Sequence, residues 1–242
     1  MSNKAAVIVG VGAARGLGAA VARRFGREGF RLTVMGRNGD KLNPTVSELR
    51  ATGAAVEGVV GDVTDQALVG RVVAAAEAHA PIEAAVFNAG GNWPKPLLEA
   101  DAKYFEEMWR VNALAGLFFA QAALHQMLPR GHGTIIFTGA SASLRGRANF
   151  VGFASAKAAL RAVAQSAARE FGPKGIHVAH VVVDGAIDGD RIATFLPKLK
   201  EQRGPDGLLD PDAIAENYWT LHCQQRSAWT HELDLRPWVE TW

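Results

Sequence analysis

Residues 10–18 read Gly-Val-Gly-Ala-Ala-Arg-Gly-Leu-Gly and join a short apolar run, residues 5–9, to a segment of helical periodicity. Gly12 and Gly16 allow a tight turn and a close approach of the backbone to a phosphate, and Gly18 allows the helix to pack on a sheet. Free N–H groups at the start of that helix favour an anion. A tight turn alone is the alternative, but it leaves the flanking strand and helix without a role. The stretch therefore predicts a phosphate-binding strand, turn and helix.

Short apolar runs alternate with longer segments of helical periodicity along the rest of the chain. This alternation is typical of a parallel sheet with helices on both faces. The predicted strands are 5–9, 31–35, 54–59, 84–87, 134–138, 177–183 and 230–235, and the predicted helices are 17–28, 41–51, 65–79, 102–128, 151–171 and 212–223. The sequence thus predicts an α/β fold, a doubly wound seven-stranded parallel sheet in one Rossmann domain over residues 1–242. Residues 187–209 are rich in glycine, proline and mixed charge, and we expect an irregular, lid-like insertion there.

Composition limits the class of partner. The 242 residues, 48% of them hydrophobic, suffice for one core. The 26 Lys and Arg against 24 Asp and Glu leave a formal charge of +2, too small to favour nucleic acid or a membrane surface. The single cysteine, Cys223, has no intramolecular disulfide partner, and no Cys/His spacing predicts a metal site. With no signal-peptide pattern, we expect a cytoplasmic protein with a small-molecule substrate.

The end of the second predicted strand reads Met-Gly-Arg-Asn, residues 35–38. An acidic side chain at this place would bind a free ribose 2′-hydroxyl. Here Gly36 leaves no carboxylate, and Arg37 supplies a cation for a 2′-phosphate. Arg15 in the glycine loop is a second candidate cation, whereas Asp40 comes too late in the chain to take the acidic place. NADP(H) is therefore favoured over NAD(H), the alternative being that both arginines are solvated surface charges.

Several motifs follow one another in a particular order: Gly12-x-x-x-Gly16-x-Gly18, Asp62-Val63, Asn88-Ala89-Gly90, Asn112 and Lys157. In type and order they resemble the short-chain dehydrogenase/reductase family, and the resemblance covers nearly the whole chain. It implies a nicotinamide cofactor, held at the following positions: Gly12, Arg15, Gly16, Leu17, Gly18, Arg37, Asn38, Asp62, Val63, Asn88, Ala89, Gly90, Lys157 and Gly185.

The resemblance also implies a hydride transfer with four catalytic side chains. In the family a tyrosine is the general acid or base, a serine steadies the substrate oxygen, a lysine binds the ribose and lowers the tyrosine pKa, and an asparagine holds a water. Lys157 and Asn112 match the last two. The tyrosine belongs four residues before the lysine, where this chain has Phe153. The serine belongs where this chain has Ala140, so that Ser141, or Ser143 in the same loop, is the nearest hydroxyl.

Other groups are candidates for the missing proton donor. The chain has only two tyrosines, Tyr104 and Tyr218, and packing roles are the more common outcome for both. Asp184 and Asp188 follow the sixth predicted strand, at the edge of the sheet where ligands gather. A desolvated aspartate there could donate a proton, and the alternative is a carboxylate that stabilises its loop.

Two functions stay open. The first is an NADPH-dependent oxidoreductase with a non-standard catalytic set, Asn112, Ser141, Phe153 and Lys157, acting on a small carbonyl, imine or activated alkene. The second is a catalytically inactive NADP(H)-binding protein with a sensing or scaffolding role. The C-terminal segment 228–242 carries three of the six tryptophans, which suits burial in its own domain or at an interface. By resemblance we expect a homodimer or homotetramer.

Overall fold

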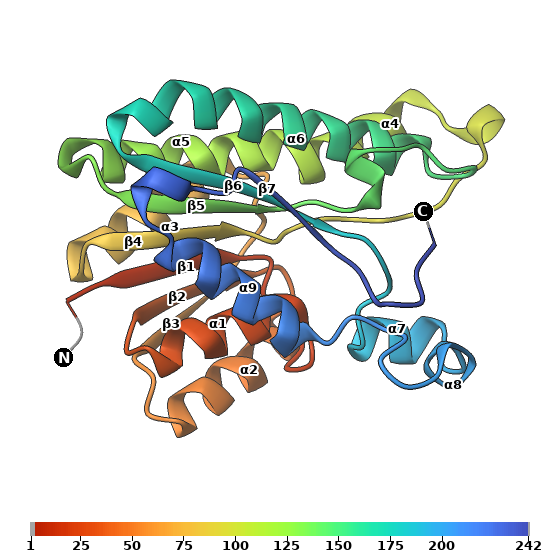
Figure 1. Cartoon of the computed structure of the whole chain (residues 1–242), viewed down its shortest axis with the longest axis horizontal. Coiled ribbons are helices and arrows are strands. Elements are labelled where there is room, and N and C mark those ends of the chain that lie inside the picture. The colour runs from red at the N-terminus through yellow and green to blue at the C-terminus, as the bar shows by residue number, and fades with distance from the viewer. Residues whose placement is uncertain (1–2, 242) are drawn as a thin grey trace.

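The computed structural model describes residues 3–241, which form one parallel sheet (Figure 1). Its seven strands lie in the order β3-β2-β1-β4-β5-β6-β7. They are β1 (Ala5–Val9), β2 (Arg31–Gly36), β3 (Val56–Val60), β4 (Ile82–Phe87), β5 (Gly133–Thr138), β6 (Ile176–Val183) and β7 (Glu232–Leu235). The order reverses between β1 and β4, so a crevice opens beyond their carboxyl ends. The predicted fold is confirmed, and the predicted strands at 54–59, 84–87 and 230–235 have shifted ends.

Helices cover both faces of the sheet (Figure 1). They are α1 (Leu17–Arg27), α2 (Gly39–Ala51), α3 (Gln66–His79), α4 (Ala102–Trp109), α5 (Ala115–Met127), α6 (Val151–Phe171), α7 (Asp190–Phe195), α8 (Leu199–Arg203) and α9 (Pro211–Cys223). Alternate side chains of a strand point to opposite faces. In β1, Val7 and Val9 therefore pack under α3, α5 and α6, whereas Ala6 and Ile8 pack under α1, α2 and α9. Two cores result, one on each face.

The predicted helix 102–128 contains an interruption. A single π turn, Arg110–Leu114, separates α4 from α5. Within residues 3–241, the stretch Ala102–Arg130 is the one helix long and apolar enough to cross a membrane, with a mean hydropathy of 1.2. Half of its most apolar window is buried, and it packs on α3, α6 and β4. It is therefore a helix of the protein core.

Residues 187–209, here called the lid segment, are more regular than expected. They contain α7 and α8, and a β-bridge between Ile187 and Leu209 closes the base of the segment. Figure 1 shows the two helices beyond the carboxyl edge of the sheet, near the C-terminal tail. The lid segment also contacts the glycine loop, because an Arg15 guanidinium nitrogen lies 3.3 Å from an Asp188 carboxylate oxygen. It is thus placed beside the crevice.

Candidate active site

The glycine loop is fixed by close backbone contacts. Gly10 has φ +85°, a left-handed conformation that favours glycine, and packs against the backbone of Asn88 and Ala89. A Cβ on Gly18 would lie 2.7 Å from the Gly10 carbonyl oxygen. The Asn88 amide donates a hydrogen bond of 3.0 Å to that same oxygen. Gly12 differs from these residues, since a Cβ there would meet no described atom within 4 Å. The loop is therefore tied to β4 and leaves open space at Gly12.

The N-terminus of α1 fits an anion. Gly16 caps the helix without a side-chain hydrogen bond, and the first turn contains no acidic residue. Its first N–H groups remain available for a phosphate. Leu17 is 5% exposed and its side chain lies in the core, so this predicted cofactor-binding residue offers a ligand its backbone N–H rather than its side chain. This arrangement fits the pyrophosphate of a dinucleotide.

A cavity of about 360 Å³ lies beside the loop. Several predicted cofactor-binding residues line it: Gly12, Arg37, Asn38, Val63, Asn88, Ala89 and Gly90. Lys41, in the first turn of α2, also lines it and was not predicted; the signal for it is a second cation four residues after Arg37. The Asn38 side chain caps α2 by accepting a 3.2 Å hydrogen bond from the Lys41 N–H. Two cations therefore face a cavity at the place expected for a 2′-phosphate.

Arg15 and Asp62, two of the predicted cofactor-binding residues, interact with other side chains of the protein. The Arg15 side chain is 58% exposed and pairs with Asp188 of the lid segment, whereas Arg37 and Lys41 line the cavity. Asp62 accepts hydrogen bonds of 2.8 Å from both the N–H and the hydroxyl of Thr64. These contacts position Asp62 just before Val63, and they make Arg15 a link between the glycine loop and the lid segment.

Asn112 and Lys157 converge on Gly90. A Cβ on Gly90 would lie 2.8 Å from the Asn112 Oδ1 and 3.4 Å from the Lys157 Nζ. The π turn carries Asn112, which is fully buried, and its side chain accepts from the Gly91 N–H at 3.3 Å and donates to the Gly91 carbonyl at 3.1 Å. Asn112 also donates to the Met108 carbonyl at 2.9 Å. The predicted asparagine, lysine and Asn-Ala-Gly turn therefore meet in space.

Lys157 is buried and has few partners. Lys157 is 5% exposed, and its Nζ donates a 2.9 Å hydrogen bond to the Thr138 carbonyl. Burial lowers the pKa of Lys157 to about 8. The ring of Phe153 lies one turn earlier on α6, with its centroid 5.9 Å from Nζ, within the range of a cation–π contact. The phenylalanine therefore fills the expected tyrosine position with a ring that contacts the ammonium group.

The two serines in the loop after β5 differ in the hydrogen bonds that their hydroxyls form. Ser141 and Ser143 begin and end a 3₁₀ turn. The Ser143 hydroxyl accepts a hydrogen bond from the Ala140 N–H at 3.2 Å and lies 3.3 Å from the His180 Nε2. Among the described residues the Ser141 side chain forms no hydrogen bond. Ser143 therefore stabilises the loop, and Ser141 keeps a free hydroxyl.

Ser143 belongs to a chain of polar groups that crosses three elements. The His180 Nδ1, in β6, lies 3.0 Å from a Glu232 carboxylate oxygen in β7. Arg161 of α6 donates two hydrogen bonds, of 2.6 and 2.7 Å, to the same carboxylate. Burial lowers the pKa of His180 to about 4, which keeps the ring neutral at pH 7. These contacts join the β5–α6 loop to the edge of the sheet, and no short sequence motif marks them.

The other candidate proton donors are engaged elsewhere. Asp184 is buried, and one Arg145 guanidinium nitrogen lies 3.1 Å from each of its oxygens. Asp188 pairs with Arg15 and, at 2.6 Å, with Lys200. Both aspartates therefore act as ion-pair partners. Gly185, predicted to contact the cofactor, packs closely on Pro237, where a Cβ would lie 2.8 Å from the proline ring.

Neither tyrosine offers a free hydroxyl. The Tyr218 hydroxyl lies 2.7 Å from the Thr138 Oγ1 in the core, and burial raises its pKa. The Tyr104 hydroxyl donates to the Trp93 carbonyl at 2.7 Å. Both residues have packing or structural roles, as the sequence favoured.

The two described C-terminal tryptophans differ in burial. Trp229 stacks on His177, with ring centroids 4.8 Å apart and planes at 2°. Trp238 is 79% exposed, and its indole N–H donates to the Pro205 carbonyl of the lid segment at 3.4 Å. Trp242 lies outside the described residues. One ring thus packs on its own domain, and one remains available at the surface.

Comparisons with known proteins give the family. The family model described as short chain dehydrogenase matches residues 4–195. The crystal structure of a short-chain dehydrogenase from Rhodopseudomonas palustris is 39% identical, with a TM-score of 0.84 over 98% of this chain and 100% of that one. An alcohol dehydrogenase of the archaeon Thermococcus sibiricus, solved with 5-hydroxy-NADP, is 28% identical, with a TM-score of 0.85 over 98% of each chain. The 2,5-dichloro-2,5-cyclohexadiene-1,4-diol dehydrogenase LinX of Sphingobium indicum is 32% identical over 220 residues, 89% of this chain and 87% of its own. The chain therefore belongs to the short-chain dehydrogenase/reductase family of oxidoreductases.

Proposed function

We propose that this chain is an NADP(H)-dependent oxidoreductase that transfers a hydride to a small carbonyl, imine or activated alkene. The observation that carries the proposal is the convergence of Asn112 and Lys157 on Gly90, which itself lines the cavity beside the glycine loop. The residues fit the cofactor: the uncapped start of α1 suits the pyrophosphate, and the Lys157 ammonium suits the ribose hydroxyls.

The side chains at the site have distinct tasks. When bound, the nicotinamide supplies the hydride. Lys157 would hold the ribose hydroxyls, Asn112 fixes the turn that follows Gly90, and the Phe153 ring has no proton to provide. A missing general acid typically costs a factor of about 10² to 10⁴ in rate. With a pKa of about 8, Lys157 can release a proton close to neutral pH, directly or through water. The reduction of iminium ions and activated alkenes should be slowed least by the missing tyrosine hydroxyl, because hydride transfer to them needs no strong acid.

Preference for NADP(H) over NAD(H) is part of the proposal. It is supported by glycine at position 36, by Arg37 and Lys41 at the cavity, and by the NADP derivative bound to the Thermococcus sibiricus relative. Replacing Arg37 by glutamine should weaken NADPH binding by about tenfold or more and leave NADH binding within about twofold, because only NADPH carries the 2′-phosphate. Fluorescence titration measures both. Equal effects on the two cofactors would contradict the assigned preference.

An inactive NADP(H)-binding protein is the second candidate, favoured by Phe153 and Ala140. The deciding experiment measures NADPH binding and then NADPH oxidation with ketones, quinones, enones and imines. Turnover of at least one class supports the enzyme. Saturable binding without turnover in every class supports the binding protein with a sensing or scaffolding role.

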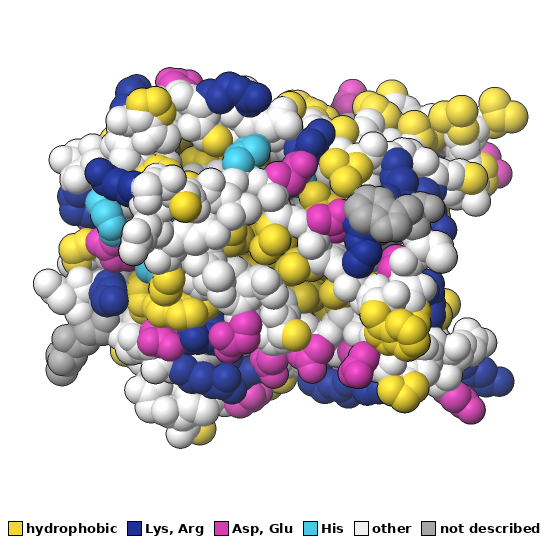
Figure 2. Space-filling model, in the orientation of Figure 1, with side chains coloured by type: hydrophobic (Ala, Val, Ile, Leu, Met, Phe, Trp, Pro, Cys, Tyr) yellow, Lys and Arg dark blue, Asp and Glu magenta, His cyan; other side chains and the backbone are white. Residues whose placement is uncertain are grey.

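We also propose that the protein is cytoplasmic and forms a homodimer or homotetramer. Exposed apolar side chains support self-association: Leu97 and Leu98 before α4, and Phe195 and Leu196 at the end of α7, are 52 to 100% exposed. Figure 2 shows hydrophobic surface near both places. Light scattering on the purified protein tests the oligomeric state, and a monomeric mass across the micromolar range would exclude a homodimer or homotetramer.

A further inference from the structure

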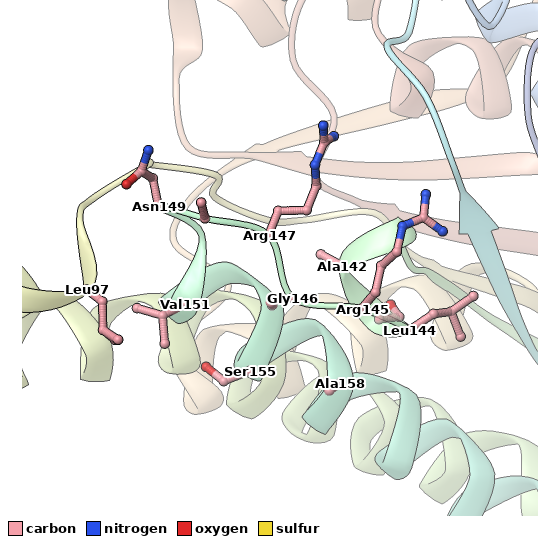
Figure 3. A pocket seen from close by; sticks show the side chains of 13 residues that line it. Leu97, Ala142, Leu144, Arg145, Gly146, Arg147, Asn149, Val151, Ser155 and Ala158 are labelled. Carbon is pink, nitrogen blue, oxygen red and sulfur yellow. The ribbon is translucent and has the colours of Figure 1, made fainter. Parts of the chain in front are cut away.

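The loop between β5 and α6 carries two arginines, Arg145 and Arg147, whose side chains extend in the same direction. Figure 3 shows both guanidinium groups on one side of the loop, directed away from α6. Arg145 reaches the carboxyl end of β6, where it binds Asp184. Arg147 therefore points toward the same edge of the sheet, at which ligands of doubly wound folds bind.

The two arginines differ in how far they are neutralised. The Arg145 guanidinium binds Asp184, a carboxylate that also has Arg236 at 3.6 Å, while Arg236 in turn pairs with Asp234. Arg147 is exposed, and within residues 3–241 its side chain forms neither a hydrogen bond nor an ion pair. The Arg147 guanidinium is therefore a cation at this edge whose charge no described side chain neutralises.

The lid segment adds a further cation on the same side. Arg191, in α7, donates a 3.0 Å hydrogen bond to the Asn92 carbonyl, in the stretch that follows Gly90 and Gly91. The loop 145–147 and the lid segment therefore both bring arginines to the region around the crevice. A guanidinium fork matches the two oxygens of a carboxylate, and the interaction strengthens where water is excluded.

We propose that the substrate carries a carboxylate and that Arg147 binds it. The proposal rests on the oxidoreductase function proposed above and adds the substrate class to it. Arg147 is then a specificity-determining residue: the carboxylate is held at the β5–α6 loop while the reacting carbon lies nearer to Phe153 and Lys157. Arg145, already bound to Asp184, supports the loop.

The test uses keto acids and their esters as matched pairs: benzoylformate with methyl benzoylformate, and levulinate with methyl levulinate. NADPH oxidation gives kcat/KM for the wild type, Arg147→Gln and Arg147→Lys. Arg147→Gln should lower kcat/KM for the acids by about tenfold or more and for the esters by less than about twofold. Arg147→Lys should retain part of the preference, because it keeps the charge and loses the fork.

Arg71→Gln is the matched control, since Arg71 is an exposed arginine on α3 and the change removes the same charge. It should alter neither substrate class. Equal loss for acids and esters in Arg147→Gln, no loss for either, or wild-type turnover of esters but not acids would overturn the proposal.

A binding measurement separates this proposal from the proposed function. If the wild type oxidises NADPH with neither class, calorimetric titration of benzoylformate into the NADP⁺-saturated protein decides. Saturable binding that weakens about tenfold in Arg147→Gln supports the carboxylate site even without turnover. Absence of binding to the wild type overturns it.

Discussion

Phe153 contacts the Lys157 ammonium but has no proton to transfer. Replacing Phe153 by tyrosine should place a hydroxyl close to Lys157 and raise kcat for ketone reduction by about tenfold or more, because a positioned general acid contributes about 10² to 10⁴. Steady-state kinetics with a ketone measure the gain. Phe153→Leu is the control and should give none. No gain with tyrosine would show that Ala140 or the shape of the pocket also limits the rate.

Two glycines of the same loop should respond oppositely to alanine. Gly18→Ala should destabilise the protein, because its Cβ would lie 2.7 Å from the Gly10 carbonyl oxygen. Gly12→Ala should leave the melting temperature unchanged, since its Cβ meets no described atom within 4 Å, yet weaken NADPH binding by about tenfold where the backbone must approach the pyrophosphate. Calorimetry and cofactor titration test both. Unchanged NADPH binding in Gly12→Ala would place the phosphates elsewhere.

Residues within short motifs were predictable, and long-range partners were not. The positions of Asn88, Asn112 and Lys157 follow from local patterns, and the structure brings Asn112 and Lys157 together at Gly90. The contact between His180 and Ser143 depends on how β6 lies beside β5, and a side chain's partner across neighbouring strands cannot be read from one segment. The same holds for the pairing of Asp184 with Arg145.

At the scale of elements, Glu232 joins β7 to α6 and β6. Glu232→Gln should lower the free energy of unfolding by about 2 kcal/mol, because it replaces a charged acceptor of two Arg161 hydrogen bonds and one His180 contact. Urea unfolding measures the change. Glu216→Gln is the control: its carboxylate binds Arg24 but is 56% exposed, so a loss below about 1 kcal/mol is expected. Equal losses of unfolding free energy in Glu232→Gln and Glu216→Gln would mean that the lower exposure of Glu232 does not strengthen its ion pairs.

Long elements were predicted more accurately than short ones. The apolar periodicity of α6 predicts its observed bounds, whereas α7 and α8 span six and five residues and are too short to show one. The π turn between α4 and α5 is equally hard to predict, because no proline or glycine interrupts residues 102–115. Sequence patterns therefore locate the scaffold and miss the shape of the lid segment.

For the whole molecule, buried neutral histidines predict sensitivity to acid. Burial lowers the pKa of His180 and His222 from 6.5 to about 4, and that of His177 is also lowered. Below pH 6.5 the unfolded chain binds protons that the folded chain does not, so the free energy of unfolding falls down to about pH 4. The slope is at most about 1.4 kcal/mol per pH unit for each histidine.

Urea unfolding between about pH 8 and pH 4 measures this slope. His222→Gln should reduce it by one histidine's share, and His125→Gln, at an exposed position on α5, is the control. A slope in His222→Gln equal to that of the wild type would contradict the assignment to His222.

The strand order also determines how the sheet meets other chains. Its two outer strands, β3 and β7, each leave one row of backbone groups without a strand partner within residues 3–241. Both are short, β3 with five residues and β7 with four, and both carry charge: Glu57 in β3, and Glu232 and Asp234 in β7, which Pro237 follows. Short, charged edges with a nearby proline are poor templates for adding a strand. Neither edge therefore favours an added strand, and the sheet is protected against edge-to-edge aggregation.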